Sequence, residues 1–347
     1  MRTPTFLLIS LAVGAAVFGL ARELGNEYVF FAGYTVLQYI VLSTGWNILG
    51  GYTGYVNFGS AAFFAVGAYS SVALIKFEPL IDPWFPEWIA PVLHAIFPLS
   101  VPALVLAGAV VSGLIGFGMG YLTLRLRGAF FAIATLAMAV VLQTLIVNWD
   151  YVGGSRGAYI IRPATIPLLD SYIQYLFLIM LVLAVLSLTA ARMIERSRLG
   201  YGFATIRDDE LAAEACGVPT LRLKLIATTL SGALMGMAGA PFPYYIGYLQ
   251  PSSAFGLEYA VNSIAMPMIG GTTSWVGPLI GAILLGTLQQ VATVTISSAV
   301  NLLIVGLLLT GFVIIAPNGI IGLVHKYARG RSLSEFVGLR RAQAEKP

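Results

Sequence analysis

Long stretches without any charged side chain constrain the fold of this chain more than any other feature of its sequence. No Asp, Glu, Lys or Arg occurs in residues 29–75, 88–124, 128–149, 171–191, 225–257 and 259–324. The lipid interior offers no water to an unpaired backbone group, and an unpaired charge costs several kcal/mol there. Such segments must therefore cross a bilayer as helices or line a protein-enclosed cavity. Only 10% of the residues are charged, against about 25% in a soluble domain, so a soluble core is excluded.

The lengths of these segments predict ten membrane spans, because a bilayer-crossing helix needs about 20 mainly apolar residues. The first seven lie near residues 4–20, 29–50, 58–76, 101–124, 129–147, 171–191 and 223–246. The last run must return the chain to the side of its basic tail, which takes one crossing or three. Three short spans fit that run best, near residues 259–273, 275–295 and 299–317. For residues 1–20, a cleaved secretory signal is the alternative.

We therefore expect an all-α integral membrane protein of about ten transmembrane helices. Residues 1–324 would form a single transmembrane domain with a cytoplasmic loop at 192–224, and residues 325–347 a basic cytoplasmic tail. No soluble domain is expected, since the longest polar segments hold only about thirty residues, well short of a domain.

The distribution of basic residues predicts the orientation of these spans, because Lys and Arg are retained on the cytoplasmic side. Fifteen of the nineteen basic residues fall on one side: Arg2, Arg125, Arg127, six from Arg192 to Lys224 and six from Lys326 to Lys346. The other four are Arg22, Lys76, Arg156 and Arg162. The loops on that second side carry Glu78, Asp82, Glu87, Asp150 and Asp170. Both termini are thus expected in the cytoplasm.

Small residues recur at four-residue spacing in several spans. The clearest sets are Ser112, Gly116 and Gly120, then Gly232, Gly236 and Ala240, then Gly277 and Gly281. In lipid this spacing lets helix backbones approach closely and pack by van der Waals contact. The pattern predicts a tightly packed bundle.

A polar island interrupts the apolar spans, with eleven of the thirty-four formal charges between Arg192 and Lys224. Thr205 can cap a helix that begins near Ile206, with Asp208 and Asp209 in its first turn, and Gly217 suits a left-handed stop. We expect a short charged helix on the cytoplasmic face to which a partner docks. A solvated interhelical loop is the alternative.

Five segments of the sequence carry a resemblance to a known family. In chain order they are Asn47–Ser60, Leu124–Leu136, Ser197–Leu225, Ser231–Ala240 and Ile264–Gly281. They resemble the LivM-type permease subunits of branched-chain amino-acid ABC importers, and Ser197–Leu225 is similar to the cytoplasmic coupling loop of ABC-importer permeases. The matching segments lie between residues 40 and 290.

The resemblance implies a type II-like ABC importer permease bundle in a prokaryotic cytoplasmic membrane. It implies four kinds of partner: a homologous second permease (LivH-like), two cytoplasmic ATPase subunits, an external solute-binding protein and membrane lipid. It also implies leucine, isoleucine and valine as substrates. The ATPase-coupling residues would be Arg207, Asp208, Asp209, Glu210, Glu214 and Gly217. In one departure from the general importer signature, the spacing between Glu214 and Gly217 is compressed.

The chain itself lacks the means to hydrolyse ATP. No G-x-x-x-x-G-K-[ST] loop occurs, so ATP hydrolysis is expected on separate partner subunits and this chain is not expected to be an enzyme. A single cysteine, Cys216, and two histidines make no metal-site pattern, and we expect neither a cofactor nor a metal.

Two segments are candidates for the translocation path. Glycines between Gly50 and Ser60 permit an unwound turn, and Pro267 removes a helix donor ahead of Gly270, which favours a broken or bent span. Transporters often place substrate contacts at broken spans. The candidate path residues are Asn47, Thr53, Asn57, Pro267, Gly270 and Gly271. A short interhelical turn is the alternative for the first segment.

An ATP-independent facilitator or channel for a small solute, such as urea or short amides, is the competing class. The charged island distinguishes the two, because a facilitator has little use for it. A proton-driven carrier needs ionisable groups inside the bilayer, and Glu258, at a span boundary, comes nearest to one. The basic tail is expected to meet anionic lipid headgroups, and nucleic-acid binding is not expected.

Overall fold

The computed structural model describes residues 3–86, 88–162, 169, 171–295 and 319–328, with the single positions 303, 306, 307, 310 and 311. Apart from those single positions, the predicted span 299–317 lies outside the described residues. So do Arg2, Glu87, Asp170 and the tail beyond Ala328.

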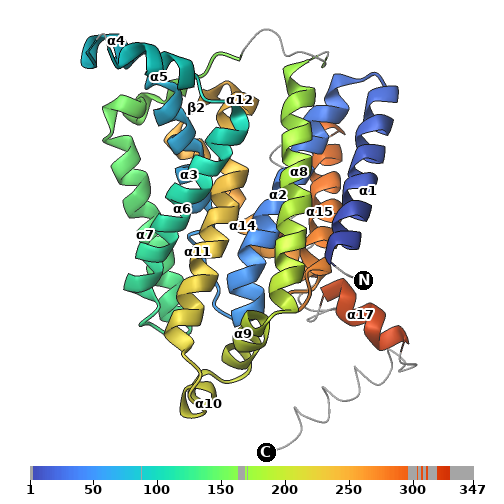
Figure 1. Ribbon diagram of the computed structural model, residues 1–347. Coiled ribbons are helices and arrows are strands. Elements are labelled where there is room, and N and C mark those ends of the chain that lie inside the picture. The colour runs from blue at the N-terminus through green and yellow to red at the C-terminus, as the bar shows by residue number, and fades with distance from the viewer. Residues whose placement is uncertain are drawn as a thin grey trace, which may run out of the picture.

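Nine helices stand side by side as an upright bundle in the described part of the chain (Figure 1). They are α1 (Thr3–Glu23), α2 (Glu27–Thr53), α3 (Ser60–Ile75), α6 (Val101–Thr123), α7 (Ala129–Val147), α8 (Tyr172–Glu195), α11 (Thr220–Gly239), α14 (Leu257–Gly270) and α15 (Val276–Thr295). Each coincides with a predicted span, and the all-α membrane fold is confirmed.

Seven of the described segments are long and apolar enough to cross a membrane, α11 being continued by α12 (Phe242–Ile246). An eighth is formed if α3 is joined to the bent segment Glu78–Trp84, which turns by 40°. The described residues hold seven or eight spans of full length and the shorter α14, so the predicted count of about ten is not confirmed.

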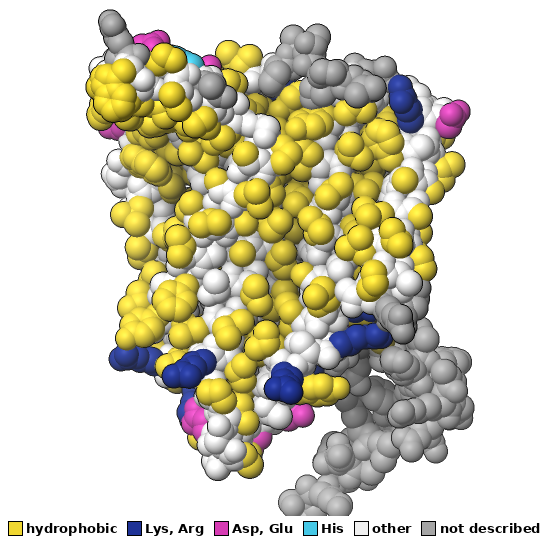
Figure 2. Space-filling view, in the orientation of Figure 1, with side chains coloured by type: hydrophobic (Ala, Val, Ile, Leu, Met, Phe, Trp, Pro, Cys, Tyr) yellow, Lys and Arg dark blue, Asp and Glu magenta, His cyan; other side chains and the backbone are white. Residues whose placement is uncertain are grey.

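Short elements close the two ends of the bundle. We call the end that carries α9 (Arg198–Asp208) and α10 (Glu210–Ala215) the basic end, because most of the described Lys and Arg residues lie there (Figure 2). The opposite end carries η1 (Glu78–Leu80), α4 (Ile81–Trp84), α5 (Ala90–Ile96), η2 (Asp150–Val152), η3 (Gly154–Arg156), β1 (Ala158–Tyr159), α12, β2 (Tyr248–Leu249) and α13 (Pro251–Ala254). β1 and β2 pair antiparallel, with Ala158 opposite Leu249. α17 (Gly319–Ala328) lies beside the basic end (Figure 1).

Small residues bring the helix backbones into contact, as their spacing predicts. A Cβ added to Gly232 would lie 2.8 Å from the carbonyl oxygen of Ser112, so α11 and α6 touch backbone to backbone. A Cβ on Gly281 would overlap the carbonyl of Met266, which joins α15 to α14 in the same way. On the face shown in Figure 2, apolar side chains spread over the bundle between its two ends. This is the surface expected of a chain that lies in lipid.

The helix breaks lie one turn later than the glycine and proline patterns predict. Gly50 and Gly51 are helical, and α2 ends only at Gly54, whose φ of 77° is left-handed. α14 likewise continues through Pro267 and ends at Gly270, with Gly271 at φ 120°. Each helix ends at a glycine because glycine tolerates positive φ. Pro267 removes one hydrogen bond from α14, but the helix continues past it. The non-helical connections are thus residues 54–59 and 271–275.

Candidate functional site

The polar island forms two short helices rather than one. Ser197 caps α9 by accepting hydrogen bonds from the amides of Leu199 and Gly200, at 3.1 and 3.4 Å. The chain then breaks at Asp209, whose carboxylate accepts from the amide of Ala212 at 3.0 Å and caps α10. The predicted helix start at Thr205 is therefore wrong. Its hydroxyl instead donates to the carbonyl of Gly202 inside α9.

Gly217 ends α10 as predicted, with a left-handed φ of 82°. Its amide donates to the carbonyl of Glu214 at 2.9 Å, and the amide of Val218 donates to that of Ala213 at 3.0 Å. These two bonds define a Schellman motif, which satisfies the free carbonyls at a helix end. Both ends of α10 are thus fixed by specific groups, so its six residues keep a defined shape.

α9 is anchored to the transmembrane helices by two buried side chains. Phe203 and Ile206 lie in a hydrophobic cluster at the basic end. The cluster's other buried members come from four parts of the chain: Ile48, Leu49, Tyr52, Tyr55, Leu124, Phe131 and Ala227. Burial of large apolar side chains provides about 1.5–3 kcal/mol each. α9 is therefore part of the bundle rather than a solvated loop.

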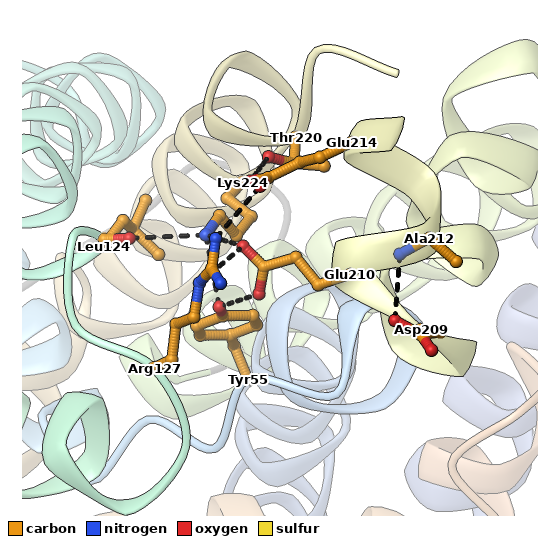
Figure 3. Close-up of polar contacts among 9 residues, drawn as sticks. All are labelled: Tyr55, Leu124, Arg127, Asp209, Glu210, Ala212, Glu214, Thr220 and Lys224. Atoms are coloured by element: carbon orange, nitrogen blue, oxygen red, sulfur yellow. Dashed lines mark hydrogen bonds and ion pairs between the residues drawn. The ribbon is translucent and has the colours of Figure 1, made fainter. Parts of the chain in front are cut away.

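A buried ion pair connects α10 to α11. The ammonium of Lys224 lies 2.6 Å from Oε1 of Glu210, and the two side chains are only 3% and 13% exposed (Figure 3). The same ammonium donates to the hydroxyl of Tyr55 at 3.1 Å and to the carbonyl of Leu124 at 3.3 Å. Tyr55 in turn donates to Oε2 of Glu210. One lysine thus holds together α10, the α2–α3 connection and the end of α6.

A second, more exposed pair supports the first. Nη2 of Arg127, in the α6–α7 connection, donates to Oε2 of Glu214 at 3.0 Å, and its Nε lies 3.7 Å from Oε1 of Glu210 (Figure 3). The hydroxyl of Thr220, the first residue of α11, donates to Oε1 of Glu214 at 2.7 Å. Both carboxylates of α10 are therefore directed toward the bundle.

These contacts set the ionisation of the cluster. Burial alone raises the pKa of Glu210, but hydrogen bonds from Lys224 and Tyr55 and the charges of Lys224 and Arg127 outweigh it and lower the pKa below its usual value. Burial, followed by the hydrogen bond to Glu210, raises the pKa of the Tyr55 hydroxyl. Glu210 is accordingly ionised and Tyr55 neutral at physiological pH, so the tyrosine acts as a donor.

The predicted coupling residues therefore divide into two groups. Asp209, Glu210, Glu214 and Gly217 cap, fasten or end α10. Arg207 and Asp208 are exposed at the end of α9, and Nε of Arg207 lies 3.5 Å from Oδ1 of Asp208. Beside them the apolar or aromatic side chains of Leu211 and Tyr201 are 64% and 71% exposed. This exposed group is the surface of the α9–α10 unit that a partner can contact.

The predicted path residues are buried within the subunit. Asn47, Thr53 and Asn57 are each 1% exposed. The side chain of Asn57 accepts from the amide of Gly59 at 2.7 Å, and Thr53 donates to the carbonyl of Leu49 at 2.6 Å. The side chain of Asn47 interacts with the hydroxyl of Tyr52 but makes no well-formed hydrogen bond within the described chain. A buried amide of that kind is unusual in a folded protein.

The structure brings the two predicted path segments together. A Cβ on Gly51 would lie 2.5 Å from the carbonyl oxygen of Thr272, so the α14–α15 connection packs against α2 one turn from Asn47. Pro267 and Gly270 are buried just before that connection, and Gly271 begins it. Their proximity fits a shared role, and Thr53 also lines a pocket together with Tyr55, Arg127 and Glu210 of the Lys224 cluster.

Sequence reasoning missed three members of the cluster: Tyr55, Arg127 and Lys224. The sequence places Lys224 where the predicted loop 192–224 overlaps the predicted span 223–246, and in the structure it lies within α11. The available signal was a lysine at the start of an otherwise uncharged span, a position where an ammonium needs a partner. Nothing in the sequence indicates that this partner is Glu210.

Comparison with known proteins gives one family. The family described as "Branched-chain amino acid transport system / permease component" matches residues 28–316. The permease protein LivM of a high-affinity branched-chain amino acid transport system from Salmonella typhimurium is 30% identical over 272 residues, 71% of this chain and 59% of that protein. A probable LivH permease from Methanocaldococcus jannaschii is 24% identical, over 88% of this chain and 95% of that protein. The autoinducer 2 import permease LsrC of Yersinia enterocolitica is 24% identical over 58% of this chain and 57% of that protein.

No solved structure matches the chain significantly. The chain spans about 59% of the length of the LivM relatives. The family match nevertheless covers α2 to α15, and so includes the bundle, the α9–α10 unit and the Lys224 cluster. This chain belongs to the family of permease components of branched-chain amino acid transport systems.

Proposed function

We propose that this chain is a permease subunit of an ATP-driven importer that carries branched-chain amino acids, or a similar small polar solute, across a prokaryotic cytoplasmic membrane. The family match over residues 28–316 and the names of the LivM and LivH relatives support this proposal. Its partners would be a homologous LivH-like permease, two cytoplasmic ATPase subunits and an external solute-binding protein. No ATP or other cofactor would bind to this chain.

The observation that carries the proposal is the fastening of α10 to the transmembrane helices. Lys224 bonds to Glu210, Tyr55 and the carbonyl of Leu124, so one buried group connects the short helix to α11, α2 and α6. An ATP-driven permease needs a rigid element at its surface through which a partner can move the membrane helices. A facilitator needs none, and the alternative of an ATP-independent channel is not favoured.

The exposed group on α9 and α10 would form the contact with the ATPase subunits. Tyr201, Asp208 and Leu211 project from the unit, with Arg207 beside them. Glu210, which is largely buried, and Glu214, which is bonded to Arg127 and Thr220, would transmit movement rather than touch the partner. This division refines the role expected of all six coupling residues.

The basic end would face the cytoplasm, with both termini on that side, because Lys and Arg are retained there. Residues 1–324 would form one transmembrane domain with the coupling loop at 192–224. Residues 325–347 would form a basic tail at anionic lipid headgroups, where each Lys or Arg adds about 1 kcal/mol.

Transport would follow from movement of α10. When the ATPase subunits close, they push on the α9–α10 unit, and the Lys224–Glu210 pair passes the displacement to α11. The helices then swing the path between outward and inward openings. ATP and solute must bind the two states unequally for this cycle to be driven. Asn47, Thr53, Asn57, Pro267, Gly270 and Gly271 would line or shape the uncharged path.

Affinity purification in mild detergent tests the assembly, with identification of every co-eluting chain. We expect Leu211→Lys to abolish co-purification of the ATPase subunits, because it places an ammonium in the exposed apolar contact. The control Trp84→Lys, at the opposite end and 77% exposed, should retain them. Leucine uptake by proteoliposomes of the complex should require ATP. Uptake by the permease alone would establish the facilitator instead.

A further inference from the structure

Glu258 is the one charged residue in a long apolar stretch of the chain. Residues 225–257 and 259–324 contain no Asp, Glu, Lys or Arg. Glu258 lies in the first turn of α14, where the helix dipole favours an ionised carboxylate. The Lys224 cluster at the basic end does not involve this residue, and the proposed coupling mechanism makes no use of it.

A relay of three buried side chains holds the carboxylate. The hydroxyl of Tyr39, on α2, donates to Oε1 of Glu258 at 3.2 Å. Nδ2 of Asn262 donates to the Tyr39 oxygen at 3.0 Å, and Nε2 of Gln289, on α15, donates to Oδ1 of Asn262 at 2.9 Å. The three relay side chains are at most 3% exposed.

The direction of this relay is imposed by a carboxylate at its end. An ionised Glu258 can only accept, so the single hydroxyl hydrogen of Tyr39 must point toward it. Asn262 must then present its amide N–H to Tyr39 and its carbonyl to Gln289. Each group thus donates toward Glu258, and such a chain of donors strengthens its final bond to an anion. The relay thus holds the carboxylate in a fixed position.

The carboxylate lies at membrane depth. Its partner Tyr39 is near the middle of the 27 residues of α2, about 18 Å along the helix from its first residue at a rise of about 1.5 Å per residue. Glu258 is nonetheless exposed on the surface of the subunit, as is the neighbouring Leu257. A carboxylate facing hydrocarbon costs several kcal/mol. The surface around Glu258 must therefore face water or another protein.

We infer that Glu258 faces the aqueous path and receives the ammonium group of the translocated amino acid. The inference rests on the proposed function, and it names the group of the solute that this subunit recognises. An amino acid carries an ammonium, and a fixed carboxylate gives that group a charge-assisted hydrogen bond. Tyr39, Asn262 and Gln289 are positioning residues that aim the carboxylate. Urea and short amides, which lack an ammonium, gain nothing from it.

Uptake by the reconstituted importer, with its partner subunits and binding protein, tests the recognition. Glu258→Gln should lower ATP-driven leucine uptake by about tenfold or more, the loss expected when a bond to a charged group is removed. Tyr39→Phe should lower uptake by a smaller factor, and Glu258→Asp should retain part of it. Leu257→Gln, an exposed neighbour without charge, is the matched control and should transport normally. Unchanged uptake by Glu258→Gln would overturn the inference.

Chemical labelling tests the position independently of transport. The chain contains only Cys216, so Glu258→Cys in a Cys216→Ser background gives a single reactive thiol. A water-soluble cationic methanethiosulfonate should modify that thiol in the assembled complex, and saturating leucine should slow the reaction. A thiol that stays unmodified, or a Glu258→Gln variant that loses the second permease on purification, would place the residue in a covered interface and overturn the inference. Failure of the proposed function would appear differently, as leucine uptake by the unaltered complex that does not depend on ATP.

Discussion

The ammonium of Lys224 lies 2.6 Å from the carboxylate of Glu210, and so the base of a transmembrane helix holds the first residue of α10. The two charged residues lie on α10 and α11, which are separated in the sequence by the turn that follows Gly217. Because both side chains are largely buried, α10 cannot move away from α11 without separating the pair. The ion pair thus connects the surface helix α10 directly to the membrane helix α11.

Removing the lysine should destabilise the protein and uncouple transport. We expect Lys224→Met to lower the free energy of unfolding by about 2–4 kcal/mol, somewhat less than the full cost of an unpaired buried charge because Tyr55 still donates to Glu210. Thermal unfolding in detergent and ATP-driven uptake measure the two effects. Arg222→Met, an exposed cation two residues earlier, should change neither. Adding Glu210→Gln to Lys224→Met should restore part of the stability, and a further loss would contradict the pairing.

The ion pair between Lys224 and Glu210 should persist in mild acid. The pKa of Glu210 is lowered, chiefly by its hydrogen bonds with Lys224 and Tyr55, so its contribution to stability is complete above the ordinary glutamate pKa of 4.5 and is lost as the pH falls through its lower folded value. The protection factors of the α10 amides against hydrogen exchange, corrected for the pH dependence of intrinsic exchange, should therefore be the same at pH 7 and at pH values down to 4.5, and should fall only below that. Glu210→Gln should abolish the acid-induced fall. A fall that begins near neutral pH would exclude Glu210 as its cause.

The break between the two short helices should depend on Asp209 alone. Asp209→Ala removes the cap of α10, which costs about 0.5–2 kcal/mol and should fray its first turn. Hydrogen exchange at the amide of Ala212 should rise several-fold, by the same free energy. Asp208→Ala is the matched control, since Asp208 is adjacent, exposed and caps neither helix. Equal effects of the two variants would show that charge, rather than capping, matters here.

The contact between α3 and α11 should not tolerate a single added methyl group. A Cβ on Gly67 would overlap the backbone of Gly236, so Gly67→Ala should lower stability by about 1–3 kcal/mol. Gly118→Ala on α6 meets no atom within 4 Å and should be neutral or slightly stabilising. Thermal unfolding of the two purified variants makes the comparison. Equal melting temperatures of the two variants would mean that α3 and α11 lie further apart than described.

The membrane helices could be predicted closely because a segment that crosses lipid must be a long apolar run without charged side chains. The span predicted at 129–147 is α7, and the span predicted at 101–124 is α6 to within one residue. Charges bound α7 at Arg127 and Asp150 and follow the end of α6 at Arg125, and each ends an apolar run sharply. The short elements at the opposite end follow no such rule, and their sequences predicted loops.

The polar island was harder to predict because three residues compete to cap a helix there. Ser197, Thr205 and Asp209 all have suitable side chains, and local sequence does not choose among them. In the structure Ser197 and Asp209 each cap a helix, and α9 between them buries Phe203 and Ile206 against distant parts of the chain, a contact that local sequence does not show. The partners of Lys224 are also beyond sequence reasoning, since Tyr55 and Leu124 are 169 and 100 residues away along the chain.

Backbone contact at the glycines restricts how this subunit can change shape. Gly67 and Gly108 bring the backbones of α3 and α6 against Gly236 of α11, with the small side chain of Ser112 beside it. Sliding one of these helices along another would drive main-chain atoms into each other. We therefore expect the three helices to move together, with the hinges of the subunit in non-helical stretches such as residues 54–59 and 271–275.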